Sequence, residues 1–322
     1  MAVRLREFAL ISKHFAPLAT SRGALSLTDD ACVIEENSHC DLVVTSDALI
    51  EGVHFLNRDP PNLIARKALR VNLSDLAAKG AQTLGYLLAI CLPRHCGEDW
   101  LEAFAAGLAE DQDRFGVSLL GGDTTATRGP LTLAITALGR VPKGRMIARG
   151  GARPGDGVFV SGTIGDAGAG LAICKGELLA GEGADFLVGR YRLPTPRLEL
   201  GRALLGTAAA ALDVSDGLIG DLAHIAEVSK VRITVDAERI PLSDALAGAW
   251  GRETEAVVRA ATAGDDYEIA FTAATQEGAL AAGRRAGVPI TRIGRVETGE
   301  GVVLLDGAGR EIPVIQPGYS HF

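Results

Sequence analysis

The sequence lacks the features that mark a membrane protein, a secreted disulfide scaffold or a nucleic-acid-binding protein. Its longest stretch without a charged residue, "GAQTLGYLLAICLP" over residues 80–93, is shorter than the roughly 20 apolar residues that span a bilayer. The five cysteines form no CxxC pair and are odd in number, which suggests neither a zinc knuckle nor a disulfide framework. The formal net charge of -8 opposes binding to nucleic acid or to an anionic membrane. We therefore expect a cytoplasmic protein with no membrane span and no nucleic-acid partner.

Several common catalytic motifs are also missing. No GxxxxGK[ST] segment and no HRD or DFG set occurs, so P-loop and protein-kinase chemistry are excluded. There is no GxSxG elbow and no HExxH pair. The glycine-rich stretch "SGTIGDAGAGLAI" (161–173) does not have the GxGxxG spacing, and we interpret it as a helix N-terminus that packs closely.

The chain has the size and composition of a folded protein with two domains. It contains 322 residues, of which 47% are hydrophobic and 22% are charged. Glycine is abundant at 40 residues, which indicates many tight turns and close backbone contacts. The N-terminal segment predicts an amphipathic helix with Leu5, Phe8, Ile11 and Phe15 on one side.

Strand-like and helix-like segments alternate along the chain, which predicts an α/β (α+β) fold. In the first half, one helix is expected from Asp59-Pro60 to near Gly80 and another over 98–115, ended by Gly116. Glycine, proline and arginine replace the apolar pattern over 141–157, as in an interdomain connection. We therefore predict an N-terminal domain over 1–148 and a C-terminal α/β domain over 149–322. In the second half, a helix is expected from Pro196 to about Ala209.

Short acidic segments recur through both predicted domains. Most aspartates in such turns cap helices or bind their own backbone, and Asp75 could pair with Lys79 four residues on. Three of the segments follow apolar strand-like runs, however, which would place their carboxylates at the carboxyl ends of strands, where ligand sites gather. The six segments are "LTDDACV" (27–33), "VTSDALI" (44–50), "NLSDLAAKG" (72–80), "LLGGDTT" (119–125), "LDVSDGLIGDLAHIA" (212–226) and "AGDDYEIAF" (263–271).

Converging carboxylates repel one another unless cations lie between them. Oxygen donors without a cysteine or histidine cluster select hard cations, and Mg²⁺ uses a few carboxylates together with waters and phosphates. The acidic segments therefore favour a magnesium-phosphate site over simple helix capping. Arg145, Arg149 and Arg153 could bind a phosphate or lie in a solvated loop, and a packed, hydrogen-bonded side chain is the ordinary expectation for His54.

Five of these segments, in this order, resemble the thiamine-monophosphate kinase family over essentially the whole chain. They read "TSDALIEGVHF", "KALRVNLSDLAAKGA", "LLGGDTT", "ALDVSDGLIGDL" and "GDDYEIAFT". The family belongs to the aminoimidazole-ribonucleotide-synthetase-like ATP-binding superfamily. The resemblance implies a two-domain PurM-like protein that is a homodimer through its N-terminal mixed sheets and helices. The implied activity is ATP-dependent, Mg²⁺-assisted in-line phosphorylation of thiamine monophosphate to thiamine diphosphate, the last step of thiamine diphosphate biosynthesis. The N-terminal domain would bind ATP and metal, and the C-terminal domain would complete the nucleotide and substrate site.

The resemblance also implies roles for individual residues. In this chain "LSLTDD" stands where the family usually has GIGDD, and Asp265 stands where it usually has Glu. The residues that bear directly on phosphoryl transfer would be Asp47, Asp75, Asp123 and Asp213. Ligands of several Mg²⁺ ions would be Asp30, Thr45, Ser46, Asp47, Asp75, Asp123, Asp213 and Asp216. ATP would contact Gly122, Asp123, Arg149 and Ser215, and thiamine monophosphate would contact His54, Asp265 and Tyr319.

Two other activities remain open from the sequence. One is a sister reaction of the superfamily, such as the ATP-dependent cyclisation carried out by aminoimidazole ribonucleotide synthetase. The other is a non-catalytic protein that binds nucleotide or metal. The "GVHF" and "GDDYE" segments favour the thiamine branch over the sister reaction, and the non-catalytic alternative stays open.

Overall fold

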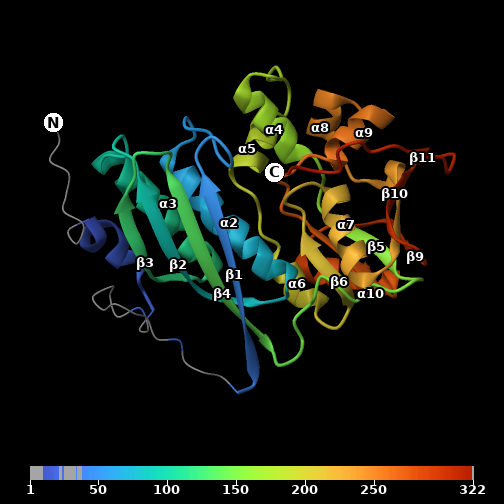
Figure 1. Ribbon diagram of the computed structural model, residues 1–322, viewed down its shortest axis with the longest axis horizontal. Coiled ribbons are helices and arrows are strands. Elements are labelled where there is room, and N and C mark those ends of the chain that lie inside the picture. The colour runs from blue at the N-terminus through green and yellow to red at the C-terminus, as the bar shows by residue number, and fades with distance from the viewer. Residues whose placement is uncertain (1–9, 22–23, 25–33, 35–37, 321–322) are drawn as a thin grey trace. The chain divides into compact units, whose positions relative to one another are not determined.

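The computed structural model describes residues 10–21, 24, 34 and 38–320 (Figure 1). Its internal contacts divide the chain into two units. The first runs to Leu76 and continues over Gln82–Gly144, and the second comprises Ala77–Ala81 and the chain from Arg145 onward. Of the predicted N-terminal helix, the described part shows a π-helical turn, Ile11–Phe15, with Phe15 buried. Leu5 and Phe8 lie outside the described residues.

The first unit contains a four-stranded mixed sheet in the order β1-β4-β2-β3. Its strands are β1 (Cys40–Ile50), β2 (Gln82–Leu92), β3 (Ser118–Ala126) and β4 (Thr132–Pro142). β4 pairs antiparallel with β1 and β2, whereas β2 and β3 are parallel. The helices α2 (Pro61–Ala78) and α3 (Glu98–Phe115) lie along one face of this sheet (Figure 1).

The alternation of side chains along the strands explains why helices cover that face. On β4, Leu133, Ile135 and Ala137 are fully buried at every second position. On β1 the opposite face carries Leu42 and Val44, which are 50% and 55% exposed. One face of the sheet thus forms the core of the unit, and the other presents apolar side chains at the β1 edge.

A buried ion pair joins the two helices of the first unit. Arg70 on α2 donates through Nε and Nη2 to the two carboxylate oxygens of Asp111 on α3, at 2.6 and 2.8 Å. Arg66 Nε also donates to Asp111, at 3.1 Å. Asp111 is fully buried and Arg70 is 2% exposed, so each charge depends on the other for its stability.

The second unit contains a seven-stranded sheet in the order β11-β10-β7-β9-β5-β8-β6. The pair β7–β10 is parallel and the other pairs are antiparallel. The strands are β5 (Gly157–Ser161), β6 (Ala208–Asp213), β7 (Arg232–Asp236), β8 (Ile269–Ala273), β9 (Ile290–Glu297), β10 (Gly301–Leu305) and β11 (Glu311–Ile312). The helices are α4 (Asp166–Lys175), α5 (Ala184–Arg192), α6 (Leu198–Leu204), α7 (Leu218–Ser229), α8 (Asp244–Trp250), α9 (Thr254–Ala261) and α10 (Gln276–Ala286). Apolar clusters pack on this sheet, with Phe159 of β5 stacked on Phe271 of β8.

Most of the predicted elements are confirmed, and so is the α/β (α+β) class. The helix over 98–115 has the predicted bounds because Gly116 adopts φ 62° and donates its N–H to the Gln112 carbonyl. The predicted helix from Pro196 to Ala209 is wrong in its extent: α6 ends at Leu204, and the chain enters β6 at Ala208. The sequence analysis also did not predict α5, α8 and α9, which have only seven to nine residues each.

No helix in the described part of the chain is long and apolar enough to cross a membrane.

Candidate functional site: two groups of oxygen donors

In the first unit, four residues of β1 and α2 form two neighbouring hydrogen-bonded pairs between the strand and the helix. Thr45 Oγ1 donates to Asp75 Oδ2 at 2.5 Å, and the backbone N–H of Asp47 donates to Asn72 Oδ1 at 3.1 Å. Asn72 and Asp75 are three residues apart on α2 and therefore point from the same side of the helix. Thr45 and Asp47 are two residues apart on β1 and share the face covered by α2. These four residues are called the β1–α2 group below.

Ser46 is not part of this group. It lies between Thr45 and Asp47 on the strand, so its side chain points to the opposite face of the sheet. There its hydroxyl lies 3.0 Å from Thr136 Oγ1 on β4. Of the three consecutive residues predicted as metal ligands, the structure therefore places two on the face covered by α2, where Thr45 contacts Asp75, and the third on the other face.

Asp123 lies at the opposite edge of the same sheet from Asp47. β4 and β2 separate their strands, which corresponds to about 14 Å over three strand spacings. Gly122 precedes it at a point where the chains crowd together: a Cβ placed there would be 1.8 Å from the Leu88 carbonyl oxygen. Glycine is thus required at 122 for β3 to pair with β2, and Asp123 is exposed beside it.

The predicted placement of carboxylates at the ends of strands is wrong for two of three residues. β1 continues for three residues beyond Asp47 to Ile50, and β3 continues beyond Asp123 to Ala126. Asp213 is the last residue of β6, as expected. The apolar run before each aspartate predicts a strand but not where the strand ends. It does not show that the hydrogen-bonded pairing of β1 and β3 continues through the polar residues that follow.

His54 lies in the turn that follows β1. Its Nδ1 accepts the backbone N–H of Ile50 at 3.0 Å, so in this arrangement Nε2 carries the ring proton. The His54 carbonyl accepts from Lys67 Nζ on α2 at 3.0 Å. Two contacts to neighbouring elements therefore fix the orientation of the imidazole.

In the second unit, residues 215–217 form a loop between β6 and α7, called the 215–217 loop below. Asp221, in the first turn of α7, accepts the backbone N–H groups of Ser215, Asp216 and Gly217 with one oxygen, Oδ2, at 3.0, 3.1 and 3.1 Å. Burial of Asp221 and the nearby charge of Asp216 raise its pKa to about 7, and the three N–H bonds only partly offset this shift.

Two further predicted residues contact the 215–217 loop. The backbone N–H of Asp265 donates to the Ser215 carbonyl at 2.8 Å, and that of Tyr319 donates to the Asp216 carbonyl at 2.8 Å. The structure thus brings the predicted metal, nucleotide and substrate residues Asp213, Ser215, Asp216, Asp265 and Tyr319 to one loop. Tyr319 is 51% exposed there.

Asp265 and Tyr267 have left-handed backbone conformations, with φ of 69° and 51°. Such values are uncommon for residues other than glycine and persist only where the surroundings enforce them. Tyr267 N–H donates to the Val214 carbonyl at 2.7 Å, and the Tyr267 hydroxyl lies 3.3 Å from Asp265 Oδ1. The segment is therefore held against β6 and the loop at both strained positions.

Buried acidic residues anchor this strained segment. Asp266 is fully buried and accepts the backbone N–H groups of Gly165 and Ala167, at 2.7 and 3.3 Å. Burial raises the pKa of Asp266 well above its ordinary value. Glu268 is also fully buried and is paired with Arg190 and Arg197.

The sequence analysis missed this network. "AGDDYE" shows the carboxylates, but no pattern in the sequence identifies the arginines that pair with Glu268, 78 and 71 positions away.

Arg149 lies beside the β6 edge of the seven-stranded sheet. Its neighbour Ala148 accepts the N–H of Ala211 through its carbonyl, at 3.0 Å, which extends the pairing of β6 by one bond. Arg149 is exposed. Lys79 Nζ also donates to the Ala211 carbonyl, at 2.9 Å.

Among the described residues, no group of three or more His, Cys, Asp or Glu side chains is arranged to hold a metal ion. Asp30 lies outside the described residues. The donor chemistry still fits Mg²⁺, because this ion is held by one or two carboxylates and completes its shell with waters and phosphate oxygens. The β1–α2 group and the 215–217 loop each offer carboxylates and hydroxyls without sulfur or imidazole.

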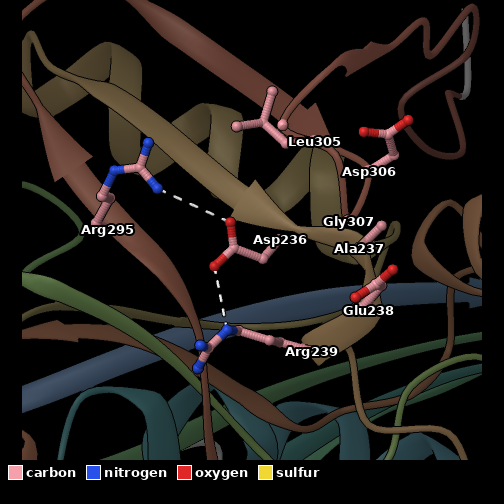
Figure 2. Close-up of a pocket in the computed structure, with 9 residues that line it drawn as sticks. Asp236, Ala237, Glu238, Arg239, Arg295, Leu305, Asp306 and Gly307 are labelled. Atoms are coloured by element: carbon pink, nitrogen blue, oxygen red, sulfur yellow. Dashed lines mark ion pairs between the residues drawn. The ribbon is translucent and has the colours of Figure 1, made fainter.

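A separate pocket of about 360 Å³ lies at the carboxyl ends of the parallel strands β7 and β10. None of the predicted site residues lines it. Asp236 lies between two arginines there, 3.2 Å from Arg239 Nε and 3.8 Å from Arg295 Nη1 (Figure 2). Both arginines of this pocket are thus paired with Asp236, while Glu238 and Asp306 add further negative charge to its lining.

The chain matches two family models with this architecture. The family described as AIR synthase related protein, N-terminal domain, matches residues 28–141, and its C-terminal counterpart matches residues 153–307. The fold and the two groups of donors therefore define an AIR synthase related protein.

Proteins that match nearly the full length of this chain identify a narrower family within this class. The chain is 45% identical to thiamine-monophosphate kinase of Caulobacter vibrioides, with 98% of this chain and 90% of the relative covered. The crystal structure of thiamine-monophosphate kinase from Stenotrophomonas maltophilia K279a is 42% identical, with a TM-score of 0.83 over 94% of this chain and 97% of that one. The structure of AaThiL complexed with AMPPCP and TMP is 31% identical, with a TM-score of 0.78 and full coverage of both chains. This chain belongs to the thiamine-monophosphate kinase family.

Proposed function

We propose that this protein transfers the terminal phosphoryl group of ATP to thiamine monophosphate, giving ADP and thiamine diphosphate. The observation that carries the proposal is the convergence of Asp213, Ser215, Asp216, Asp265 and Tyr319 on the 215–217 loop. Relatives of this chain are thiamine-monophosphate kinases, and one neighbour is complexed with AMPPCP and TMP. The proposed reaction requires metal, nucleotide and substrate to meet, which explains why residues proposed to contact each of them lie at the same loop.

The chemistry of the acceptor explains why the site needs no general base. The attacking group is a phosphate oxygen whose second pKa is about 6, so it is largely anionic at neutral pH. Positioning and neutralisation of charge are then the remaining catalytic tasks. Neither the β1–α2 group nor the 215–217 loop contains a histidine paired with a carboxylate. This agrees with a reaction that needs no general base.

The proposed ligands of Mg²⁺ come from both units. We assign Thr45, Asp47 and Asp75 of the β1–α2 group, together with Asp213 and Asp216, to metal binding. Ser46, Asp123 and Asp30 complete the proposed set: Ser46 and Asp123 are placed elsewhere on the first sheet, and Asp30 lies outside the described residues. When bound, Mg²⁺ neutralises the phosphate oxygens of two polyanions that would otherwise repel each other.

The remaining contacts divide between nucleotide and substrate. We assign Gly122, Asp123, Arg149 and Ser215 to ATP, since Gly122 and Asp123 are exposed on β3 and Arg149 is exposed beside β6. We assign His54, Asp265 and Tyr319 to thiamine monophosphate. Asp265 and His54 are suited to this role because their surroundings fix both side chains.

We further propose a cytoplasmic homodimer formed through the first sheet. The exposed apolar side chains of Leu42 and Val44 on the face not covered by helices support a partner there. Light scattering of the wild type and of Val44→Glu tests this, because a charge at the interface should shift the dimer toward monomer. A wild type that is monomeric at micromolar concentration would oppose the proposal.

A coupled assay for ADP release tests the activity. We expect ADP formation that needs both thiamine monophosphate and Mg²⁺, and thiamine diphosphate in equal amount by chromatography. The amidine precursor of aminoimidazole ribonucleotide serves as the competing substrate. ADP formation with that substrate alone, or nucleotide binding without turnover, would replace the proposal with a sister activity or with a non-catalytic role.

A further inference from the structure

We propose that Asp221 makes the 215–217 loop a turn that binds cations and not phosphate, by occupying all of its backbone N–H groups. The inference rests on the proposed function in one respect, the assignment of Asp213 and Asp216 to Mg²⁺. Asp221 is then a positioning residue for these two side chains, although it contacts neither metal nor substrate itself.

The N–H groups of the loop all point to one atom. Asp221 Oδ2 accepts from Ser215, Asp216 and Gly217 at 3.0 to 3.1 Å, and Asp221 is 4% exposed. Bonds from N–H donors to a carboxylate are stronger than those between neutral groups. Three of them at one buried oxygen fix the backbone of the loop from within.

The carbonyl groups of the loop are also bound within the chain. Ser215 O accepts from Asp265 N–H, Asp216 O accepts from Tyr319 N–H, both at 2.8 Å, and Gly217 O accepts from Asp221 N–H at 2.9 Å. Every backbone donor and acceptor of the three residues thus has a partner in the protein. The side chains and the second lone pair of each carbonyl oxygen remain to bind a ligand at this loop, whereas none of its backbone N–H groups does.

Glycines allow the partner segments to approach this closely. A Cβ at Gly264 would be 2.5 Å from Ser215 O, and one at Gly318 would be 2.7 Å from Asp216 O. A glycine precedes both Asp265 and Tyr319, and its lack of a side chain lets each segment pack against the loop.

This arrangement reverses the usual chemistry of a loop that leads into a helix. The N-terminus of a helix ordinarily presents unpaired N–H groups that bind phosphate directly. Here a carboxylate of the chain already takes the place of that anion at α7, and Asp213 and Asp216 add further negative charge. A phosphate group would meet carboxylates and no available backbone donor, whereas a cation would be attracted. Apart from a contact with the Ser215 hydroxyl, ATP phosphates should therefore reach this loop only through Mg²⁺.

Titration calorimetry with AMPPCP, with and without MgCl₂, tests the inference on the whole protein. Asp221→Ala frees three N–H groups and removes a charge, while Asp221→Asn keeps an oxygen that accepts the same bonds. Asp244→Ala, which removes an exposed carboxylate from the first turn of α8, is the matched control.

We expect Asp221→Ala to weaken Mg²⁺-dependent binding by about 10- to 100-fold, because the three hydrogen bonds that fix the loop are lost. Binding without Mg²⁺ should strengthen in the same variant, so that the ratio of the two dissociation constants falls. Asp221→Asn and Asp244→Ala should stay within about threefold of the wild type in Mg²⁺-dependent binding. A folded Asp221→Ala protein with the wild-type ratio would overturn the inference.

Two further arms keep the test decisive. If Asp221→Ala does not fold, Asp221→Glu retains the charge but displaces the oxygen, and it should weaken Mg²⁺-dependent binding; unchanged binding in this variant also overturns the inference. A wild type that binds Mg²⁺ and AMPPCP but forms no ADP contradicts the proposed function and leaves the role of Asp221 standing. Normal turnover with an unchanged ratio in Asp221→Ala contradicts the role of Asp221 alone.

Discussion

Thr45 on β1 donates its hydroxyl to the carboxylate of Asp75 on α2, at 2.5 Å, although 30 positions separate the two residues. This bond joins the strand to the helix that covers it and orients one carboxylate oxygen of Asp75. Asp47, two residues further along the strand, is fixed to the same helix through Asn72. The β1–α2 group is thus held in place by the fold before any ligand binds.

Removing the Thr45 hydroxyl should weaken metal binding with little effect on stability. Thr45→Val keeps the shape of the side chain but leaves Asp75 without this donor, and we expect the Mg²⁺ concentration for half-maximal activity to rise about 10-fold or more. Thr45→Ser retains the hydroxyl and serves as the control. A magnesium titration that gives the same midpoint for all three proteins would contradict this role of Thr45.

Neutralising a proposed metal ligand should reduce turnover far more than stability. Asp47→Asn and Asp213→Asn remove charge from sites where carboxylates repel one another, so the metal-free protein should be as stable as the wild type or more so. Thermal unfolding in EDTA and ADP release in Mg²⁺ measure the two effects. Wild-type activity in both purified variants would refute their assignment to the metal site.

The buried pair of Arg70 and Asp111 should contribute strongly to stability. Asp111→Ala removes the carboxylate that accepts two bonds from the buried Arg70, which should lower the free energy of unfolding by about 3 to 5 kcal/mol. Glu110→Ala removes only an exposed partner of Arg66 and should cost less than about 1 kcal/mol. Urea unfolding of the two variants provides the comparison, and similar losses in both would show that burial of the pair is unimportant.

Stability should fall as pH rises from about 5 to 7 because of Asp221. Its pKa is raised to about 7 in the folded protein, so over this range the native state keeps a proton that the unfolded state has released. The unfolded state then binds fewer protons, and the free energy of unfolding decreases by on the order of 2 to 3 kcal/mol. Urea unfolding in EDTA at both pH values should show this loss in the wild type and not in Asp221→Asn. Parallel pH dependence in the two proteins would show that Asp221 does not titrate there.

The left-handed backbone at Asp265 should restrict which residues are tolerated. Asp265→Asn keeps a side chain that accepts positive φ, so stability should change by less than about 0.5 kcal/mol while the KM for thiamine monophosphate rises. Asp265→Val places a β-branched residue at φ 69° and should cost at least about 1 to 2 kcal/mol. Calorimetric unfolding and steady-state kinetics separate the two effects, and equal stability of both variants would argue against strain at this position.

The order and type of most elements could be predicted because each leaves a local signal. Gly116 marks the C-terminal end of α3, and an apolar pattern runs along the whole helix, so its bounds follow from the sequence. α5 has a glycine at its N-terminal boundary and α9 a glutamate without a capping bond, and both are short, so tertiary packing decides their formation.

The resemblance gives each site residue a role that stays a prediction, and it does not give the arrangement of these residues. The opposite orientations of Ser46 and Asp47 follow only once β1 is known to extend through both residues. Nothing local indicates that β4 and β2 separate Asp47 from Asp123. The proposed role of Asp221 was also hidden, because "DVSDGLIGD" shows three similar acidic positions and only the fold reveals which one turns inward to the backbone.

The short segment Ala77–Ala81 belongs to the second unit although the chain on both sides of it belongs to the first. Gly201 of α6 packs so closely on it that a Cβ would be 1.8 Å from the Ala77 carbonyl, and the Lys79 carbonyl accepts the N–H of Ile147. No single cut in the gene can therefore yield two complete halves. In a hybrid made by exchanging the C-terminal half between relatives, residues 77–81 would come from one parent and the rest of the second unit from the other. The two parents would therefore have to be compatible at residues 77–81 as well as at the junction.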